Sequence, residues 1–163
     1  SNIVIIESRV YLKEFYDAEN HIAKRLSSLV TTCEKKYKKL DASLSMLEEI
    51  NDIVYNEKQK EAIKTALLNN VTIITGGPGT GKTTIIKAIV NLYQKLNQLK
   101  AEDLENEVAL LAPTGRASKR MSEAVLLPAS TIHRFLKWNK ENNEFAGNGI
   151  LILVNLLLLM KLV

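Results

Sequence analysis

Apolar residues recur every three or four positions along the first part of the chain, as they do on one face of an α-helix. Charged residues such as Lys13 and Arg25 stand between them. This pattern predicts a surface helix within residues 9–30. A second, shorter helix is predicted near Ser43 to Ile50, so we expect residues 1–50 to form a small helical unit. The apolar positions of the first helix are Leu12, Phe15, Ile22, Leu26 and Leu29.

From residue 51 onward, helices are expected to alternate with short apolar strands. This alternation is typical of a parallel β-sheet that is covered by helices on both faces. It predicts an α/β domain over residues 51–163, placed after the helical unit. The predicted helices cover residues 56–68, 82 to about 98, 113–125 and 129–138, with a further helix starting at Asn155. The predicted strands cover residues 71–75, 108–112 and 150–154.

The composition is that of an ordinary globular protein, with 46% hydrophobic and 25% charged residues. The single cysteine, Cys33, excludes an internal disulfide and fits a reducing compartment, so we expect a cytoplasmic location. The apolar tail from Ile150 to Val163 is interrupted by Asn155 and Lys161. It is shorter than the roughly twenty apolar residues of a spanning helix, so no membrane association is expected.

The segment "GGPGTGKT" matches the phosphate-binding pattern G-x-x-x-x-G-K-[ST] through Gly76, Gly81, Lys82 and Thr83. A β-branched strand is predicted before it and a helix after it, as the pattern requires. Glycines let the backbone turn tightly and direct successive N–H groups inward, which forms an anion-binding cup. The N-terminus of the following helix adds a partial positive charge at the same place. The segment therefore predicts a site for ATP.

Two residues of this segment are expected to act in catalysis. Lys82 places a positive charge on the terminal phosphates, and the hydroxyl of Thr83 is the expected protein ligand of Mg²⁺. The loop backbone is expected to bind the remaining phosphate oxygens. The predicted nucleotide-binding residues of the loop and the following turn are Gly76, Gly77, Pro78, Gly79, Thr80, Gly81, Lys82, Thr83 and Thr84, and Gln59 is a further candidate.

The residues alone leave two interpretations open for Gln59. Its amide can donate and accept at once, which suits the edge of an adenine base. Alternatively, Asn56 caps the following helix and Gln59, three residues later, completes a capping box. A capping box needs no ligand.

Basic residues cluster between Ala112 and Lys140, where Glu123 is the only acid. Positive charge and flat side chains are what a groove for single-stranded nucleic acid requires. Thr114, Gly115 and Arg116 follow a predicted strand and could bind a phosphate. His133, Phe135 and Trp138 could stack on bases, although Phe135 and Trp138 are also spaced like core residues on one helical face. The basic residues are Arg116, Lys119, Arg120, Arg134, Lys137 and Lys140.

The stretches "YNEKQKEAI", "GGPGTGKT", "APTGRASKRM" and "ASTIHRFL", in this order, resemble the motifs of RecD-like superfamily 1 DNA helicases. The segment "VYLKEFYDAENHIAKRLSSL" resembles the helical region before the motor in longer members. The resemblance extends to about Trp138. It implies that residues 51–163 are part of the first RecA-like ATPase domain of a helicase. The implied activity is ATP-dependent translocation, 5′ to 3′, on single-stranded DNA during recombination and repair.

The same resemblance implies roles for individual residues and a class of partner. Gln59 would hydrogen-bond the adenine, and helicase–nuclease subunits are possible protein partners. Two segments resemble the motifs that line the DNA channel. The implied DNA contacts are Thr114, Gly115, Arg116, Lys119, Arg120, Thr131, His133 and Arg134.

One expected feature is missing from the sequence. A P-loop motor normally has an Asp that holds Mg²⁺ and a nearby Glu that orients water, but no carboxylate follows Glu144. Either the motor is degenerate, or residues of a longer protein are missing between Phe145 and Leu156, which we favour. The alternative functions are a non-catalytic nucleotide-binding module and another P-loop DNA-processing ATPase, such as a relaxase-linked helicase.

Overall fold

The computed structural model describes residues 2–30, 37–139, 144–145 and 156–159, and side-chain exposure through residue 137. The chain begins with a hairpin of two antiparallel strands, β1 (Ile3–Ile6) and β2 (Arg9–Leu12). Helix α1 (Lys13–Val30) follows directly. The helix lies within the predicted range 9–30, but the first four residues of that range, 9–12, pair along the hairpin instead. Val10 and Tyr11 are of types that favour strands.

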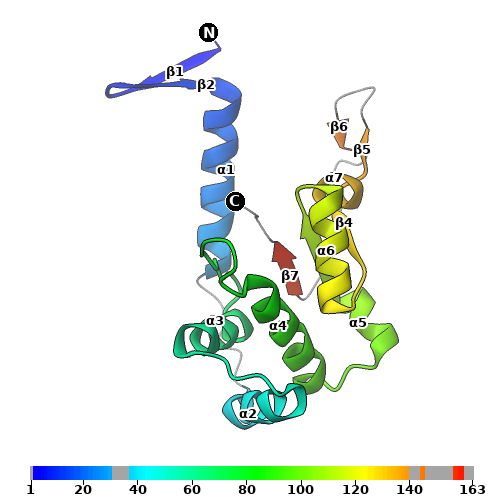
Figure 1. Cartoon of the computed structure of the whole chain (residues 1–163). Coiled ribbons are helices and arrows are strands. Elements are labelled where there is room, and N and C mark those ends of the chain that lie inside the picture. Colours follow the sequence, from blue (N-terminus) through cyan, green and yellow to red (C-terminus); the bar gives the residue numbers. More distant parts are fainter. Residues whose placement is uncertain (1, 31–36, 140–143, 146–155, 160–163) are drawn as a thin grey trace.

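The apolar face of α1 is exposed in the described part of the chain. No residue of α1 is buried, and Phe15 and Ile22 are 62% and 56% exposed. Figure 1 shows α1 extending away from the other helices, with the hairpin at its far end. Near its C-terminal end, the Asn70 side-chain amide donates a hydrogen bond of 3.0 Å to the Leu29 carbonyl.

Helix α4 (Lys82–Leu96) lies at the centre of the core. Helices α2 (Leu40–Asn51), α3 (Glu57–Leu68) and α6 (Gly115–Val125) all contact it (Figure 1). Leucines of α2 therefore share one hydrophobic cluster with the residues of the predicted ATPase domain. The packing crosses the division predicted at residue 50, and that division remains a prediction. The largest fully buried side chains are Ile63, Ile89, Val90, Leu92, Leu110 and Met121.

Three parallel strands form a sheet with the order β4-β3-β7. Their bounds are Ala129–Thr131 for β4, Val108–Ala112 for β3 and Leu156–Leu159 for β7. Helix α6 connects β3 to β4, and both strands end together because Ala112 is paired with Thr131. The predicted strand at residues 108–112 and the parallel α/β architecture are confirmed. The chain from β3 to α6 and back to a parallel β4 is the connection typical of such folds.

Two predictions about apolar segments are wrong. Residues 71–75, predicted as a strand, pair with no strand in the described part of the chain, and Ile73 is 79% exposed. The central strand β3 has no free edge for them, because β4 and β7 occupy its two sides. Leu156–Leu159, predicted as helix, forms β7 beside β3. An uninterrupted apolar run carries no periodicity, so helix and strand cannot be told apart from it.

Two polar segments also differ from expectation. Residues 101–107, which lie outside the predicted helices, form helix α5 (Ala101–Glu107), with Glu102 and Asp103 in its first turn. Negative charge at a helix N-terminus is stabilising. The helix predicted over residues 129–138 is reduced to α7 (Ile132–Phe135), because β4 precedes it. Trp138 then begins strand β5 (Trp138–Asn139), which pairs with β6 (Glu144–Phe145).

The described residues include no helix that is long and apolar enough to span a membrane. The predicted strand at residues 150–154 lies outside the described residues. So do Cys33 and the positions where we expected residues of a longer protein to be missing.

We expect replacement of Ile89 by alanine to lower the free energy of unfolding by about 2–5 kcal/mol, because the side chain is fully buried in α4. Urea unfolding followed by circular dichroism measures this change. Ile50, which is 67% exposed at the end of α2, provides the matched control. Ile50→Ala should stay within about 0.5 kcal/mol of the unmodified protein. Equal losses at both positions would contradict the described core.

Candidate functional site

The phosphate loop connects residues 71–75 to α4, and its backbone requires glycine at two positions. Gly79 and Gly81 have φ values of 72° and 80°, in the left-handed region that side chains disfavour. At Gly76, a Cβ atom would lie only 2.8 Å from the Thr80 hydroxyl oxygen. That hydroxyl donates to the Gly77 carbonyl at 2.9 Å. The glycines therefore allow a tight turn that closes on itself.

Lys82 lies folded back over this loop. Its ammonium group donates to the carbonyls of Gly76 and Gly77, at 2.7 Å each. Gly81 is the N-cap of α4 and provides no side-chain hydrogen bond, and the first turn contains no acidic residue. The start of α4 therefore combines its partial positive charge with the ammonium of Lys82. Thr83 and Thr84 lie in the same turn and bring two hydroxyl groups to it.

These features fit a nucleotide triphosphate. The two left-handed glycines shape the loop, and the residues at the helix N-terminus carry positive charge and hydroxyl donors. All residues of the loop from Gly76 to Thr80 are exposed. The loop and the first turn of α4 carry no negative side chain, since no carboxylate lies within residues 70–84.

Gln59 links the phosphate loop to the start of α3. Its backbone N–H donates to the Asn56 side-chain oxygen at 2.9 Å, and its own side-chain oxygen accepts from the Asn56 N–H at 3.0 Å. This reciprocal pair is the predicted capping box. The Gln59 side-chain nitrogen donates to the Thr80 carbonyl at 3.4 Å. It would also lie 2.7 Å from a Cβ added at Gly81. Gln59 is therefore placed against the loop while it caps the helix.

Glu48 of α2 holds the segment before this cap, a contact that is not predicted from the sequence. One carboxylate oxygen accepts from the Tyr55 N–H at 2.8 Å, and the other lies 3.2 Å from the Lys60 ammonium. The Tyr55 N–H and then Lys60 lower the pKa of the Glu48 carboxyl. The two bonds cross a loop between helices, so no local motif signals them. A charged hydrogen bond of this kind is among the stronger ones in proteins.

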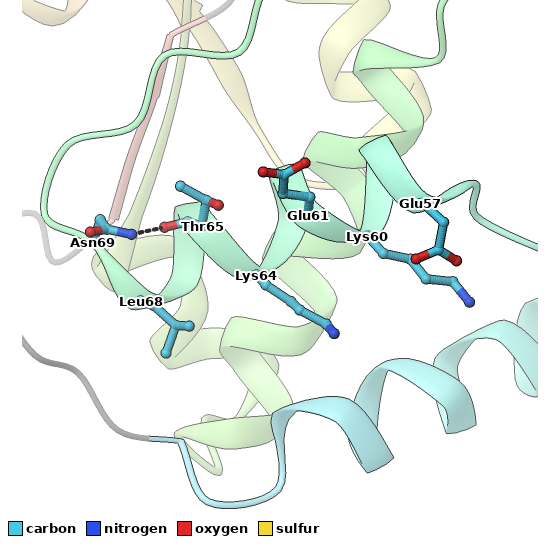
Figure 2. A pocket seen from close by; sticks show the side chains of 7 residues that line it. All are labelled: Glu57, Lys60, Glu61, Lys64, Thr65, Leu68 and Asn69. Atoms are coloured by element: carbon cyan, nitrogen blue, oxygen red, sulfur yellow. Dashed lines mark hydrogen bonds between the residues drawn. The ribbon is translucent and has the colours of Figure 1, made fainter.

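A hollow of about 290 Å³ lies along α3, away from the phosphate loop. Figure 2 shows its lining side chains, which all belong to α3 or to the residue after it. Lys60 pairs with Glu48, and Lys64 pairs with Asp41, so these lysines attach α3 to α2. Asn69 donates to the Thr65 carbonyl at 2.9 Å, as drawn in Figure 2. The hollow is part of a helix–helix junction and contains none of the predicted nucleotide contacts.

The predicted DNA-binding residues gather at the carboxyl edge of the sheet. Thr114 caps α6 by accepting from the Ala117 N–H at 3.2 Å, and Thr131 caps α7 by accepting from the Arg134 N–H at 3.1 Å. Because β3 and β4 end side by side, both helices begin at the same edge. Gly115 is the first residue of α6. The exposed residues that follow, which we call the basic edge, are Arg116, Lys119, Arg120, His133 and Arg134.

Thr114 and Thr131 are expected to contact DNA. In the structure their hydroxyl oxygens accept hydrogen bonds from backbone N–H groups at the helix N-termini. Each hydroxyl retains its hydrogen for donation elsewhere. Phe135 is half-buried, and Trp138 lies in a strand, so the two do not share a helical face.

A protein-family model described as an AAA domain matches residues 59–159, more than half of the chain. The chain therefore belongs to the AAA domain family, which confirms the predicted α/β nucleotide-binding fold and implies nucleotide binding. The match begins at Gln59 and includes the phosphate loop, the basic edge and β7.

Comparison with individual proteins confirms the resemblance to RecD-like helicases. The RecBCD enzyme subunit RecD of Buchnera aphidicola is 30% identical over 161 residues, which cover 98% of this chain and 25% of that protein. The ATP-dependent RecD2 DNA helicase of Deinococcus radiodurans is 32% identical over 135 residues, which cover 83% of this chain and 18% of that protein. The RecD subunit of Mycobacterium tuberculosis is 34% identical over 116 residues, covering 71% and 19%. The chain thus spans a quarter or less of the length of these relatives.

We expect Gly81→Ala to weaken nucleotide binding about tenfold or more, because the new Cβ would require a strained backbone and would displace Gln59. Titration calorimetry with ATP measures the affinity. Gly77 is the matched control, since a Cβ there meets no atom within 4 Å. Gly77→Ala should bind ATP within about twofold of the unmodified protein. The described loop geometry would be wrong if both substitutions had the same effect.

Proposed function

We propose that this chain is the nucleotide-binding part of an ATP-dependent DNA helicase of the RecD type, acting in DNA recombination and repair. The observation that carries the proposal is the phosphate loop, where Lys82 and the N-terminus of α4 meet a turn that contains two left-handed glycines. The relatives that share this segment are named as helicases or as subunits of the RecBCD enzyme. Because the chain covers only part of those proteins, the helicase activity belongs to the full-length protein.

The proposed cofactors are ATP and Mg²⁺. The backbone from Gly76 to Gly81 would bind phosphate oxygens, and Lys82 would exchange its two carbonyl partners for the terminal phosphates. The Thr83 hydroxyl is the proposed protein ligand of the metal, and Thr84 lies beside it. When bound, Mg²⁺ neutralises charge on the phosphates and polarises them. Gln59 would read the adenine edge.

We expect Lys82→Ala to lower DNA-stimulated ATP hydrolysis of the full-length protein about a hundredfold or more, because the positive charge at the terminal phosphates is lost. A phosphate-release assay with and without oligo-dT measures this. Lys95→Ala, on the exposed part of the last turn of α4, is the control and should retain turnover. Retained stimulation in Lys82→Ala would refute the assignment. An unmodified protein that binds ATP without any turnover would instead favour the non-catalytic module.

The basic edge is the proposed contact surface for single-stranded DNA. Arg116, Lys119 and Arg120 lie at i, i+3 and i+4 on α6, and are therefore neighbours on one helix face. His133 and Arg134 follow the adjacent strand. Thr114, Gly115 and Thr131 would add hydroxyl and backbone donors at the two helix N-termini. Positive charge along one edge attracts the phosphate backbone whatever the base sequence.

We expect Arg116→Ala to weaken binding to oligo-dT and to reduce the slope of log affinity against log salt by about 0.7, the contribution of one phosphate contact on a single strand. Fluorescence anisotropy over a series of salt concentrations measures both. Lys100, which precedes α5 at the opposite end of β3, is the matched control. Lys100→Ala should leave the slope unchanged. An unchanged slope for Arg116→Ala would remove this residue from the proposed DNA surface.

Three further properties are proposed on the resemblance to RecD-like proteins. They are 5′ to 3′ movement on single-stranded DNA, assembly with helicase–nuclease subunits, and a cytoplasmic location. The names of the RecD relatives support the second, since they are subunits of the RecBCD enzyme.

A further inference from the structure

We propose that Glu48 is a positioning residue for recognition of the nucleotide base. It would act through the start of α3, where it fixes the segment that carries Gln59. The inference rests on the proposed function, because it takes Gln59 as the residue that reads adenine. Base selectivity would then depend on the Glu48 carboxylate of α2, which lies outside the residues that the family model matches.

Glu48 contacts residues on both sides of the cap at the start of α3. One carboxylate oxygen holds the N–H of Tyr55, the residue just before the N-cap Asn56. The other oxygen pairs with Lys60, the residue just after Gln59. The Glu48 and Lys60 side chains are 15% and 28% exposed. The pair is partly shielded from water, which strengthens it relative to an exposed pair.

Glu48 connects two parts of the structure that are both held in the core, helix α2 and Tyr55. The Tyr55 side chain is 4% exposed and belongs to the hydrophobic core. Leu44 and Leu47, from the same helix as Glu48, are buried in that core as well. Glu48 therefore extends from a fixed helix to a fixed residue. The backbone between Tyr55 and Lys60 has little freedom while both bonds are made.

The contacts of the Gln59 amide fix its orientation. Its oxygen accepts from the Asn56 N–H, and its nitrogen lies at the Thr80 carbonyl, so the two ends of the amide are distinguished. Each end retains capacity, because an amide oxygen has a second lone pair and an amide nitrogen a second hydrogen. Adenine presents a donor at N6 and an acceptor at N7, whereas guanine presents two acceptors there. A fixed amide can match adenine and opposes guanine.

Glu48 thus determines how firmly the Gln59 amide is held in the orientation that distinguishes adenine from guanine. If its carboxylate is removed, the Tyr55 N–H and the Lys60 ammonium lose their partner. The capping box can then shift relative to the phosphate loop. The proposed phosphate contacts of Lys82 and Thr83 come from α4, which is held by its own buried face and not by Glu48. The predicted effect is therefore confined to the base.

The test compares three ligands on the full-length protein by titration calorimetry, namely ATP, GTP and tripolyphosphate. In Glu48→Ala we expect ATP affinity to fall about tenfold, with GTP and tripolyphosphate affinities within about twofold of the original values. The ATP-to-GTP ratio should fall by the same tenfold factor. Glu49→Ala is the matched control, because Glu49 is the adjacent, exposed carboxylate on α2. It should leave all three affinities unchanged.

A double substitution shows whether Glu48 acts through Gln59. Gln59→Ala should lower the ATP-to-GTP ratio by itself, and adding Glu48→Ala should cause little further loss. Additive losses, or an unchanged ratio in Glu48→Ala, would overturn the inference. If Glu48→Ala does not fold, Glu48→Gln and Lys60→Met replace it, since both remove the ion pair. An unchanged ratio in both would then have the same meaning.

The failure of the proposed function gives a different result. If Gln59→Ala leaves the ATP-to-GTP ratio unchanged while tripolyphosphate still binds, Gln59 does not read the base. If tripolyphosphate does not bind to the unmodified protein, the phosphate site itself is wrong. If Gln59→Ala lowers the ratio and Glu48→Ala does not, the adenine role stands and only the positioning role of Glu48 fails.

Discussion

The burial of helix α4 is the constraint on which the rest of the structure depends. Its side chains from Ile85 to Tyr93 are mostly buried, and α2, α3 and α6 all contact it. Close packing at this density leaves little room for the helix to shift. The N-terminus of α4 is therefore fixed in space, and the phosphate loop is attached to it. The contacts within the loop and the fixed helix together hold the exposed loop in one shape.

The same packing gives the N-terminal region a part in the site. Helix α2 shares the core through Leu40, Leu44 and Leu47, and reaches α3 through two ion pairs. The residues proposed to bind the base and the phosphates thus come from neighbouring helices held by one hydrophobic cluster. The basic edge is positioned separately, by the parallel pairing of β3 with β4. Nucleotide and nucleic acid would therefore be bound by different structural elements of one fold.

Local patterns predicted much of this arrangement, and contacts between distant residues limited the rest. The phosphate loop and the capping box of Asn56 and Gln59 depend on residues a few positions apart, so their spacing was sufficient. The amphipathic helices α3, α4 and α6 were predictable from periodicity for the same reason. Residues 71–75 have the composition of a strand, but pairing depends on a free edge elsewhere. Leu156–Leu159 carries no periodicity at all, and Glu48 meets Tyr55 only because two helices pack together.

The folded-back position of Lys82 has a thermodynamic consequence for ligand binding. A lysine that is free in solvent loses much rotational freedom when it grips a phosphate, and that loss opposes binding. Here the ammonium already donates to the Gly76 and Gly77 carbonyls, so part of this ordering is present before any ligand arrives. Binding then exchanges two neutral acceptors for charged ones, which are stronger partners. The gain on binding should therefore be mainly enthalpic, with a small penalty from ordering the side chain.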